Sequence, residues 1–174
     1  MIKLKGNELG RITTNEYKNT KKIPLVIVLD NIRSALNVGA VFRTSDAFLI
    51  EKIILCGITA TPPHKEIRKT ALGSTLSVNW EYETTTINAI NKLKSEGRYI
   101  IGVEQTSNSI SLKNLNVKRK SMAIIMGNEI DGVSEGALKK CHKIVEIPQF
   151  GTKHSLNISV ATGIIVWELH KNLI

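Results

Sequence analysis

The chain has 174 residues, a length typical of a single domain with one sizeable core. Hydrophobic residues make up 42% of the sequence and charged residues 22%, which excludes a wholly disordered chain. The formal net charge of +9 favours a polyanionic partner such as a nucleic acid. No apolar run is long enough to cross a bilayer, and the first residues lack the apolar stretch of a signal peptide, so we expect a cytoplasmic protein.

The cysteines and histidines do not form a recognisable metal site. Cys56 and Cys141 lie far apart in the sequence, and the four histidines show no ligand spacing such as H-E-x-x-H. We therefore expect two reduced thiols and no bound metal ion. Aromatic residues make up only 5% of the chain, which argues against binding nucleic acid through rows of stacked bases.

Residues 1–23 form a basic segment with sparse apolar residues. Six lysines and arginines against two glutamates give this segment a local charge of +4. The pattern predicts a partly ordered basic arm, separate from a domain over residues 24–174.

Residues 24–173 alternate between apolar, strand-like runs and helical patterns. We predict strands over residues 24–30, 52–56, 77–82, 99–103, 122–126 and 143–147, and helices over residues 38–48, 84–97, 134–141 and 157–173. Asn37 stands at the N-cap position of the first of these helices. Residues 57–77 are expected to be a long loop with a helical turn near 65–72, whose basic residues are candidate substrate contacts. The alternation predicts an α/β fold with a mostly parallel sheet flanked by helices.

Three segments that follow predicted elements of this sheet hold residues suited to ligand binding, since ligands bind beyond the carboxyl ends of parallel strands. They are Asn37-x-Gly39-Ala40-x-x-Arg43-Thr44, Met126-Gly127-Asn128-Glu129-x-x-Gly132 and Ile147-Pro148-x-x-Gly151-x-x-x-Ser155-Leu156-Asn157-x-Ser159-x-Ala161. Their glycines allow close backbone approach, and Arg43 has the fork shape that suits phosphate. Taken singly, the same residues are also typical of helix caps, turns and a surface cation. The phosphate-binding motifs G-x-x-x-x-G-K-[ST] and G-x-G-x-x-G are absent, so a kinase, a nucleotide hydrolase or a conventional dinucleotide enzyme is unsupported.

Together, the three segments resemble the motifs of the SpoU (TrmH) branch of the SPOUT RNA methyltransferases, and the resemblance runs from about Pro24 to about Leu169. It implies a SPOUT fold with a C-terminal trefoil knot, a homodimer with active sites at the subunit interface, and S-adenosylmethionine as the cofactor. The implied reaction is methylation of a ribose 2′-hydroxyl in structured RNA, with tRNA slightly favoured over rRNA. Many members carry an N-terminal RNA-recruiting domain, whereas here we expect only the short basic arm, which leaves the RNA target open.

The resemblance also implies which residues form the site. The cofactor would lie against the backbone at Thr106, Met126, Gly127, Ile147, Pro148, Ser155 and Leu156. The motif-matched catalytic residues would be Arg43, Asn37, Glu129, Ser155 and Asn157. Arg43 would clamp a phosphate and orient the 2′-hydroxyl, and Asn37 would position Arg43 or that phosphate. Glu129 would orient Arg43 through a charge-assisted bond, while Ser155 and Asn157 would fix the loop and the ribose.

Two other functions are compatible with the charge and the fold. One is a non-catalytic RNA-binding or assembly protein, although such a protein has no need of Glu129 and Arg43 together with an intact 147–157 segment. The other is methylation of a base rather than a ribose, which a digest to nucleosides would distinguish.

Overall fold

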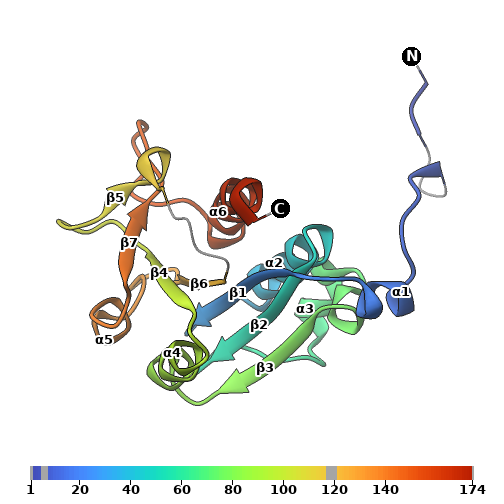
Figure 1. Ribbon diagram of the computed structural model, residues 1–174, viewed down its shortest axis with the longest axis horizontal. Coiled ribbons are helices and arrows are strands. Elements are labelled where there is room, and N and C mark those ends of the chain that lie inside the picture. The colour runs from blue at the N-terminus through green and yellow to red at the C-terminus, as the bar shows by residue number, and fades with distance from the viewer. Residues whose placement is uncertain (1, 5–7, 117–120, 174) are drawn as a thin grey trace.

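The computed structural model describes residues 2–4, 8–116 and 121–173, and its centre is a seven-stranded sheet (Figure 1). All of its strand pairs are parallel and the strand order is β3-β2-β1-β6-β4-β7-β5. The mostly parallel sheet expected from the sequence is therefore confirmed. The strands are β1 (Ile23–Asp30), β2 (Ile50–Cys56), β3 (Asn79–Glu83), β4 (Tyr99–Val103), β5 (Ile110–Ser111), β6 (Met122–Met126) and β7 (Lys143–Glu146).

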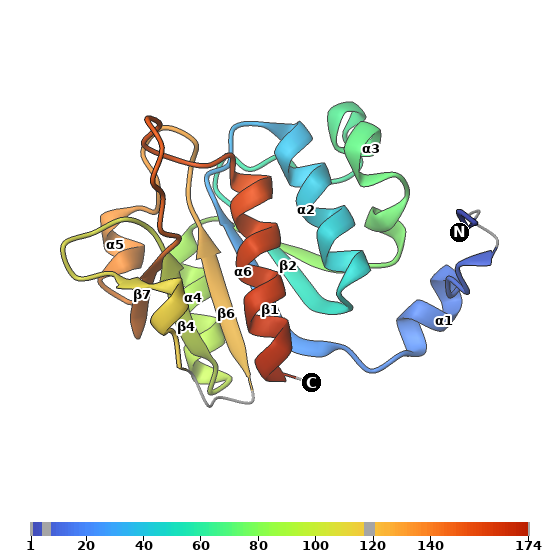
Figure 2. The ribbon, with the colours of Figure 1, turned by 90° about the horizontal axis from the view of Figure 1, so that it is seen from above.

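Helices cover both faces of the sheet. They are α1 (Thr14–Asn19), α2 (Ala35–Ala47), α3 (Lys65–Ala71), α4 (Thr86–Ser95), α5 (Glu135–Leu138) and α6 (Ile158–Leu173), with short 3-10 turns η2 (Ser74–Leu76) and η3 (Leu112–Asn114). Helices α2, α3 and α6 pack on one face, and α4 and α5 pack on the other (Figure 2). Within the described ranges, no helix is both long and apolar enough to cross a membrane.

Strand β1 lies inside the sheet and explains the continuous apolar run at its start. Leu25, Ile27 and Leu29 belong to the core under α2 and α6, whereas Val26 and Val28 belong to the core under α4. Both faces of the strand are therefore buried, as is typical of a parallel sheet covered by two helical layers.

Helix α2 begins earlier than the sequence predicts. The Ser34 hydroxyl accepts a hydrogen bond from the Asn37 N–H at 3.3 Å, so Ser34 is the N-cap and the prediction that Asn37 caps the helix is wrong. Asn37 instead lies in the first turn. Gly39 on the same helix faces α3, where an added Cβ would come within 2.3 Å of the Ile67 carbonyl oxygen. The two helices therefore pack closely only because this residue is glycine.

Three shorter elements also differ from the expectation. The loop over residues 57–77 contains α3 at the expected turn, but also η2. Strand β5 was not predicted, because two residues are too few to show a pattern of alternation. Helix α5 ends at Leu138 instead of reaching residue 141, and the side chain of its N-cap residue Ser134 makes no capping hydrogen bond.

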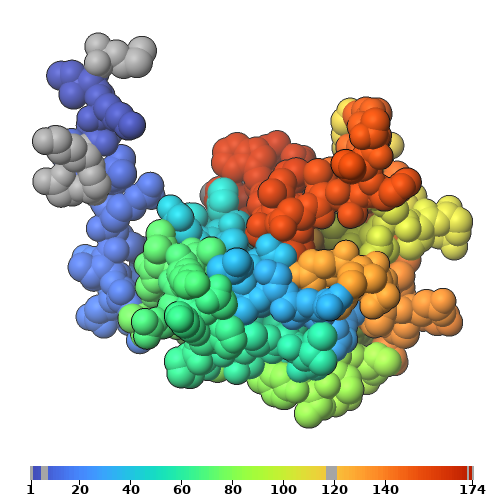
Figure 3. All heavy atoms as spheres, turned by 180° about the vertical axis from the view of Figure 1, so that it is seen from behind, coloured from blue at the N-terminus to red at the C-terminus, as the bar shows by residue number. Residues whose placement is uncertain are grey.

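The basic arm is anchored to the domain at its end. Helix α1 has a capping box between Thr13 and Glu16, and Tyr17 is buried against the core. The Tyr17 hydroxyl donates to the Ser45 carbonyl oxygen at 3.4 Å, and the Lys22 ammonium donates to the Tyr17 and Thr20 carbonyl oxygens. Residues 8–13, directly before α1, project from the rest of the molecule (Figure 3).

Candidate active site

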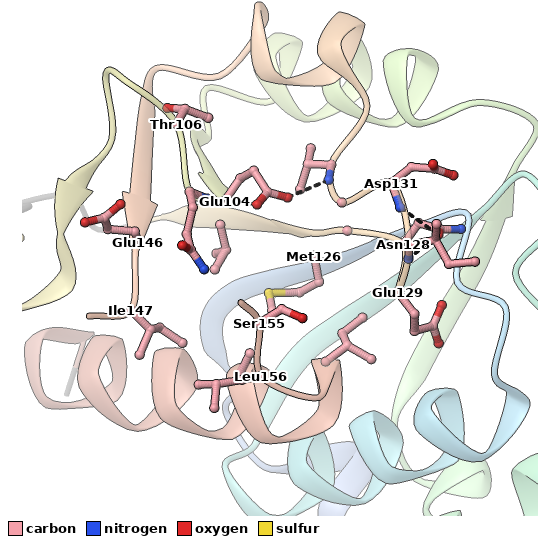
Figure 4. A pocket seen from close by; sticks show the side chains of 18 of the residues that line it. Glu104, Thr106, Met126, Asn128, Glu129, Asp131, Glu146, Ile147, Ser155 and Leu156 are labelled. Carbon is pink, nitrogen blue, oxygen red and sulfur yellow. Dashed lines mark hydrogen bonds between the residues drawn. The ribbon is translucent and has the colours of Figure 1, made fainter. Parts of the chain in front are cut away.

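A cavity of about 620 Å³ opens at the carboxyl edge of the sheet (Figure 4). Loops that follow β4, β6 and β7 form its walls, and the start of α6 closes one side. Its volume lies within the usual range for small-molecule sites. The lining residues are Val103, Glu104, Gln105, Thr106, Met126, Gly127, Asn128, Glu129, Ile130, Asp131, Gly132, Val133, Glu135, Leu138, Glu146, Ile147, Gln149, Ser155, Leu156, Asn157, Ile158 and Ala161.

The charge of the cavity is opposite to that of the chain. Among the described residues that line the cavity, none is a lysine, arginine or histidine, and five carry carboxylates: Glu104, Glu129, Asp131, Glu135 and Glu146. Such a lining favours a cationic ligand and disfavours a phosphate group. Among the described residues, no group of three or more His, Cys, Asp and Glu side chains is placed to hold a metal ion.

Most of the residues expected to hold the cofactor lie at this cavity. Six of the seven line it, and these are Thr106, Met126, Gly127, Ile147, Ser155 and Leu156. Pro148 follows Ile147 in the chain but is not a lining residue. Segments that are distant in the sequence therefore converge at one cavity.

The loop after β6 folds tightly back on itself. Asn128 and Gly132 exchange main-chain hydrogen bonds of 2.9 and 3.0 Å, and the Asn128 side chain accepts the Ile130 N–H at 2.8 Å. The Asn128 amide also donates to the Asn31 carbonyl oxygen at 2.6 Å. A Cβ on Gly127 would lie 2.3 Å from the main chain of Gly132 and Val133, so only glycine permits this turn.

Glu129 holds this loop against the start of α2. Its carboxylate accepts hydrogen bonds from the main-chain N–H groups of Arg33 and Ser34 at 2.9 and 3.1 Å, and from the Asn37 side-chain amide at 2.9 Å. Partial desolvation works against the charged form, but these hydrogen bonds outweigh it and lower the pKa of Glu129 from its usual value of 4.5. Glu129 is therefore ionised at neutral pH.

Asn37 connects the first motif to the third. The Asn157 side-chain amide donates to the Asn37 Oδ1 at 3.1 Å, and the Asn157 Oδ1 accepts the Ser159 N–H at 2.9 Å at the start of α6. Asn157, Asn37 and Glu129 thus form one hydrogen-bonded row across the three motifs. The structure brings together three of the five residues expected to be catalytic.

Arg43 lies apart from this row. It is exposed on α2, six residues beyond Asn37, which corresponds to a rise of about 9 Å along the helix. Within the described part of the chain its side chain makes no hydrogen bond or ion pair, and it does not line the cavity. The bond expected between Glu129 and Arg43 is absent in this structure, and the Glu129 carboxylate accepts a hydrogen bond from the Asn37 side chain instead. Ser155, the fifth residue, is exposed and lines the cavity.

Two further carboxylates support the same loop and were not singled out from the sequence. Asp30, buried at the end of β1, accepts the Ser134 N–H at 2.9 Å and the Thr86 hydroxyl. Glu104, which directly follows β4, accepts the Val133 N–H at 2.9 Å. The sequence signal available for both was an acidic residue at the carboxyl end of a buried strand.

The fold and the motif positions are shared with known proteins. Residues 24–167 match the SpoU rRNA Methylase family. The chain belongs to this family. The matched residues include the second and third segments, which line the cavity, and the first segment, whose Asn37 bonds to both of them.

Individual relatives give the extent of the similarity. The chain is 32% identical over 154 residues to the 23S rRNA (guanosine-2′-O-)-methyltransferase RlmB of Neisseria meningitidis, an alignment that covers 88% of this chain and 61% of that protein. The chain thus spans about three fifths of the length of that relative.

Solved structures agree with this assignment. An AdoMet-bound rRNA methyltransferase from Sinorhizobium meliloti superposes with a TM-score of 0.80 at 25% identity, covering 91% of this chain and 60% of that one. The A. aeolicus TrmH/SpoU tRNA modifying enzyme superposes equally well, with a TM-score of 0.80 at 25% identity, and covers 91% of this chain and 81% of that one.

Proposed function

We propose that this protein is an RNA methyltransferase that uses S-adenosylmethionine to methylate a ribose 2′-hydroxyl. The observation that carries the proposal is the acidic cavity enclosed by the second and third SpoU motifs, beside the row of Asn157, Asn37 and Glu129. Membership of the family supports it, and so does the relative named as a guanosine-2′-O-methyltransferase.

The lining of the cavity fits S-adenosylmethionine. This cofactor carries a sulfonium and an ammonium group, and the five carboxylates complement those positive charges. When bound, it supplies an activated methyl group. We propose that the residues holding it are Thr106, Met126, Gly127, Ile147, Pro148, Ser155 and Leu156. A related structure with AdoMet bound supports the choice of this cofactor.

The polar motif residues at the rim of the cavity and beside it would align the RNA. Arg43 has a permanently charged, fork-shaped side chain, so it suits a role as a phosphate clamp that orients the 2′-hydroxyl rather than as a general base. Asn37 is held between Glu129 and Asn157, so its orientation is fixed by both neighbours. We propose that Glu129 orients Asn37, and that Ser155 and Asn157 position the ribose.

A second copy of the chain would complete the site. Val160, Ile164 and Trp167 are exposed on one side of α6, at spacings of four and three residues. Helix α2, which carries Arg43, lies beside α6 (Figure 2). We propose that these helices form the interface of a homodimer and that Arg43 acts at the boundary between subunits. The crossed strand order, with β7 between β4 and β5, is compatible with the trefoil knot that the family resemblance implies.

The RNA would be held by basic surfaces that lie away from the acidic cavity. The exposed residues Lys18 and Lys21 of the arm are one such surface, and Lys65 and Arg68 on α3 are another. We favour tRNA slightly over rRNA as the substrate, and both the A. aeolicus tRNA modifying enzyme and the S. meliloti rRNA enzyme superpose with a TM-score of 0.80. We place the reaction in the cytoplasm.

Transfer of labelled methyl from S-adenosylmethionine into unmodified tRNA and rRNA tests the proposal. We expect label in one RNA pool, at a nucleotide that resists alkaline cleavage because its 2′-oxygen is blocked. Label in an alkali-sensitive nucleotide would indicate base methylation. Cofactor binding without transfer to any RNA fraction, including assembled ribosomal particles, would indicate a non-catalytic RNA-binding protein.

A further inference from the structure

We propose that Glu104 and Gln105 act as a positioning pair that holds the three loops of the cavity at one spacing and thereby sets cofactor affinity. Neither residue belongs to the three SpoU motifs described above. The part of the inference that concerns the cofactor rests on the proposed function, whereas the link between the loops stands on the geometry alone.

Glu104 ties the loop after β4 to the loop after β6. Its Oε2 accepts the Val133 N–H at 2.9 Å, and its Oε1 accepts the N–H of Gln105 at 2.8 Å (Figure 4 shows the first of these bonds). Gly132 has a φ of +67°, and a Cβ there would come within 2.1 Å of the Glu104 Oε2. The main chain at Gly132 and Val133 therefore passes directly over the carboxylate, and only glycine allows that approach.

Gln105 continues the connection to the third loop. Its side-chain amide donates to the His154 carbonyl oxygen at 2.7 Å, immediately before the lining residue Ser155. The main-chain N–H of Glu104 donates to the Val145 carbonyl oxygen of β7 at 3.0 Å. Two consecutive residues thus contact the loop after β6, strand β7 and the segment before α6.

The residue types suit this task. A carboxylate has two acceptor oxygens, and both face main-chain N–H donors here. A glutamine at position 104 has one acceptor oxygen and would point its own N–H groups at one of those donors. Loops that are already fixed lose less conformational freedom when a ligand binds, so the pair is expected to strengthen binding by pre-organisation.

A different explanation is that Glu104 acts only through its charge on a cationic ligand. Glu135 provides the matched control, because it is a carboxylate that lines the same cavity. Its side chain is 88% exposed and bonds to Lys139 on the next turn of the same helix at 3.2 Å, so it joins no loops. The variants Glu104→Gln and Glu135→Gln remove the same charge, but only the first breaks a link between loops.

The experiment compares Glu104→Gln, Gln105→Ala and Glu135→Gln with the wild type in two assays. Hydrogen–deuterium exchange without ligand measures how readily the main-chain hydrogen bonds of the loops open. Calorimetry measures the binding of S-adenosylmethionine and of S-adenosylhomocysteine, which lacks the sulfonium charge. For Glu104→Gln we expect faster exchange at Val133 and binding of both ligands weakened about tenfold, as expected for loss of a charged hydrogen bond. For Gln105→Ala we expect faster exchange over residues 152–157, unchanged exchange at Val133, and a smaller loss of affinity. Glu135→Gln should leave exchange unchanged at Val133 and over residues 152–157.

Several results would overturn the inference. Unchanged exchange in both Glu104→Gln and Gln105→Ala would mean that the pair does not hold the loops. Weakened binding of S-adenosylmethionine alone, to the same extent in Glu104→Gln and Glu135→Gln, would mean that only the charge matters. Failure of the wild type to bind either ligand would contradict the proposed cofactor, while the exchange measurements would still decide whether the pair holds the loops. If Glu104→Gln fails to fold, Gln105→Ala still tests the pair through its separate link to the segment before α6.

Discussion

The cavity and the N-terminal arm differ in both charge and construction. The cavity lining holds five carboxylates and no lysine or arginine, whereas the whole chain has a net charge of +9. The positive charge therefore lies outside the cavity, part of it on the arm. The contrast indicates two ligands of opposite charge, a cationic cofactor in the cavity and a polyanion on the basic surfaces.

The two regions are also ordered by different contacts. Bonds across the cavity motifs join residues more than 90 positions apart, as Glu129 does with Arg33 and Asn157 does with Asn37. The arm depends on the local capping box of α1 and on Tyr17. The cavity can therefore form only when the whole domain has folded, and the arm can change without disturbing it.

The largest effect is expected for Arg43→Ala. Arg43 lies outside the cavity, so its loss should lower the rate of methyl transfer by about a hundredfold or more while S-adenosylmethionine affinity changes less than about twofold. Single-turnover methyl transfer and calorimetry measure the two quantities. Arg43→Lys keeps the charge but loses the forked shape, so its rate of methyl transfer should lie between those of the wild type and Arg43→Ala. An equal loss of cofactor binding would place Arg43 in the cofactor site and contradict the separation between RNA alignment and cofactor binding.

Gly127→Ala should disturb the cavity and leave the basic arm unchanged. The new Cβ would meet the main chain of Gly132 and Val133 at 2.3 Å, so the turn must open and S-adenosylmethionine affinity should fall about tenfold or more. Gly151→Ala is the matched control, because a Cβ there meets nothing within 4 Å and its φ lies outside the left-handed region. Similar affinities for the two variants would show that the close approach at Gly127 does not shape the site.

A change in the arm should affect RNA and spare the cofactor. The double variant Lys18→Ala and Lys21→Ala should weaken RNA binding severalfold and reduce the steepness of its salt dependence by about two in log–log slope. Binding at several salt concentrations measures that slope. Lys94→Ala with Lys139→Ala removes two exposed lysines from α4 and the end of α5 on the other face of the sheet and should leave the slope unchanged. Equal effects of the two double variants would mean that the arm contributes only general charge.

The smallest effect is expected for the pH dependence of Glu129. Its pKa is lowered in the folded protein, so the charged carboxylate stabilises the fold above about pH 4.5, and that contribution disappears as the pH falls through the lowered pKa. Urea unfolding should show the wild type more stable than Glu129→Gln at neutral pH, with the difference shrinking below pH 4.5. A difference that is constant with pH would mean that the charge of Glu129 does not hold the loop.

Strands and motifs were accessible from the sequence because they depend on local patterns. The apolar run of β1 and the turn glycine Gly127 both follow from residues close in the chain. The N-cap of α2 was misplaced because Ser34 and Asn37 are both good capping residues, and only the structure shows Asn37 turned toward Glu129. The link from Glu104 to Val133 could not be predicted from the sequence, since a contact over 29 positions leaves no periodic pattern.

The separation of the two regions is tested most directly by measuring, on the same protein, how the affinities for RNA and for S-adenosylmethionine depend on salt concentration. We predict that RNA affinity falls steeply with increasing salt, whereas S-adenosylmethionine affinity changes less, because the cofactor is held in a cavity between loops and the RNA on exposed cations. RNA binding that is insensitive to salt, or that competes with S-adenosylmethionine for the acidic cavity, would contradict the separation of the two regions.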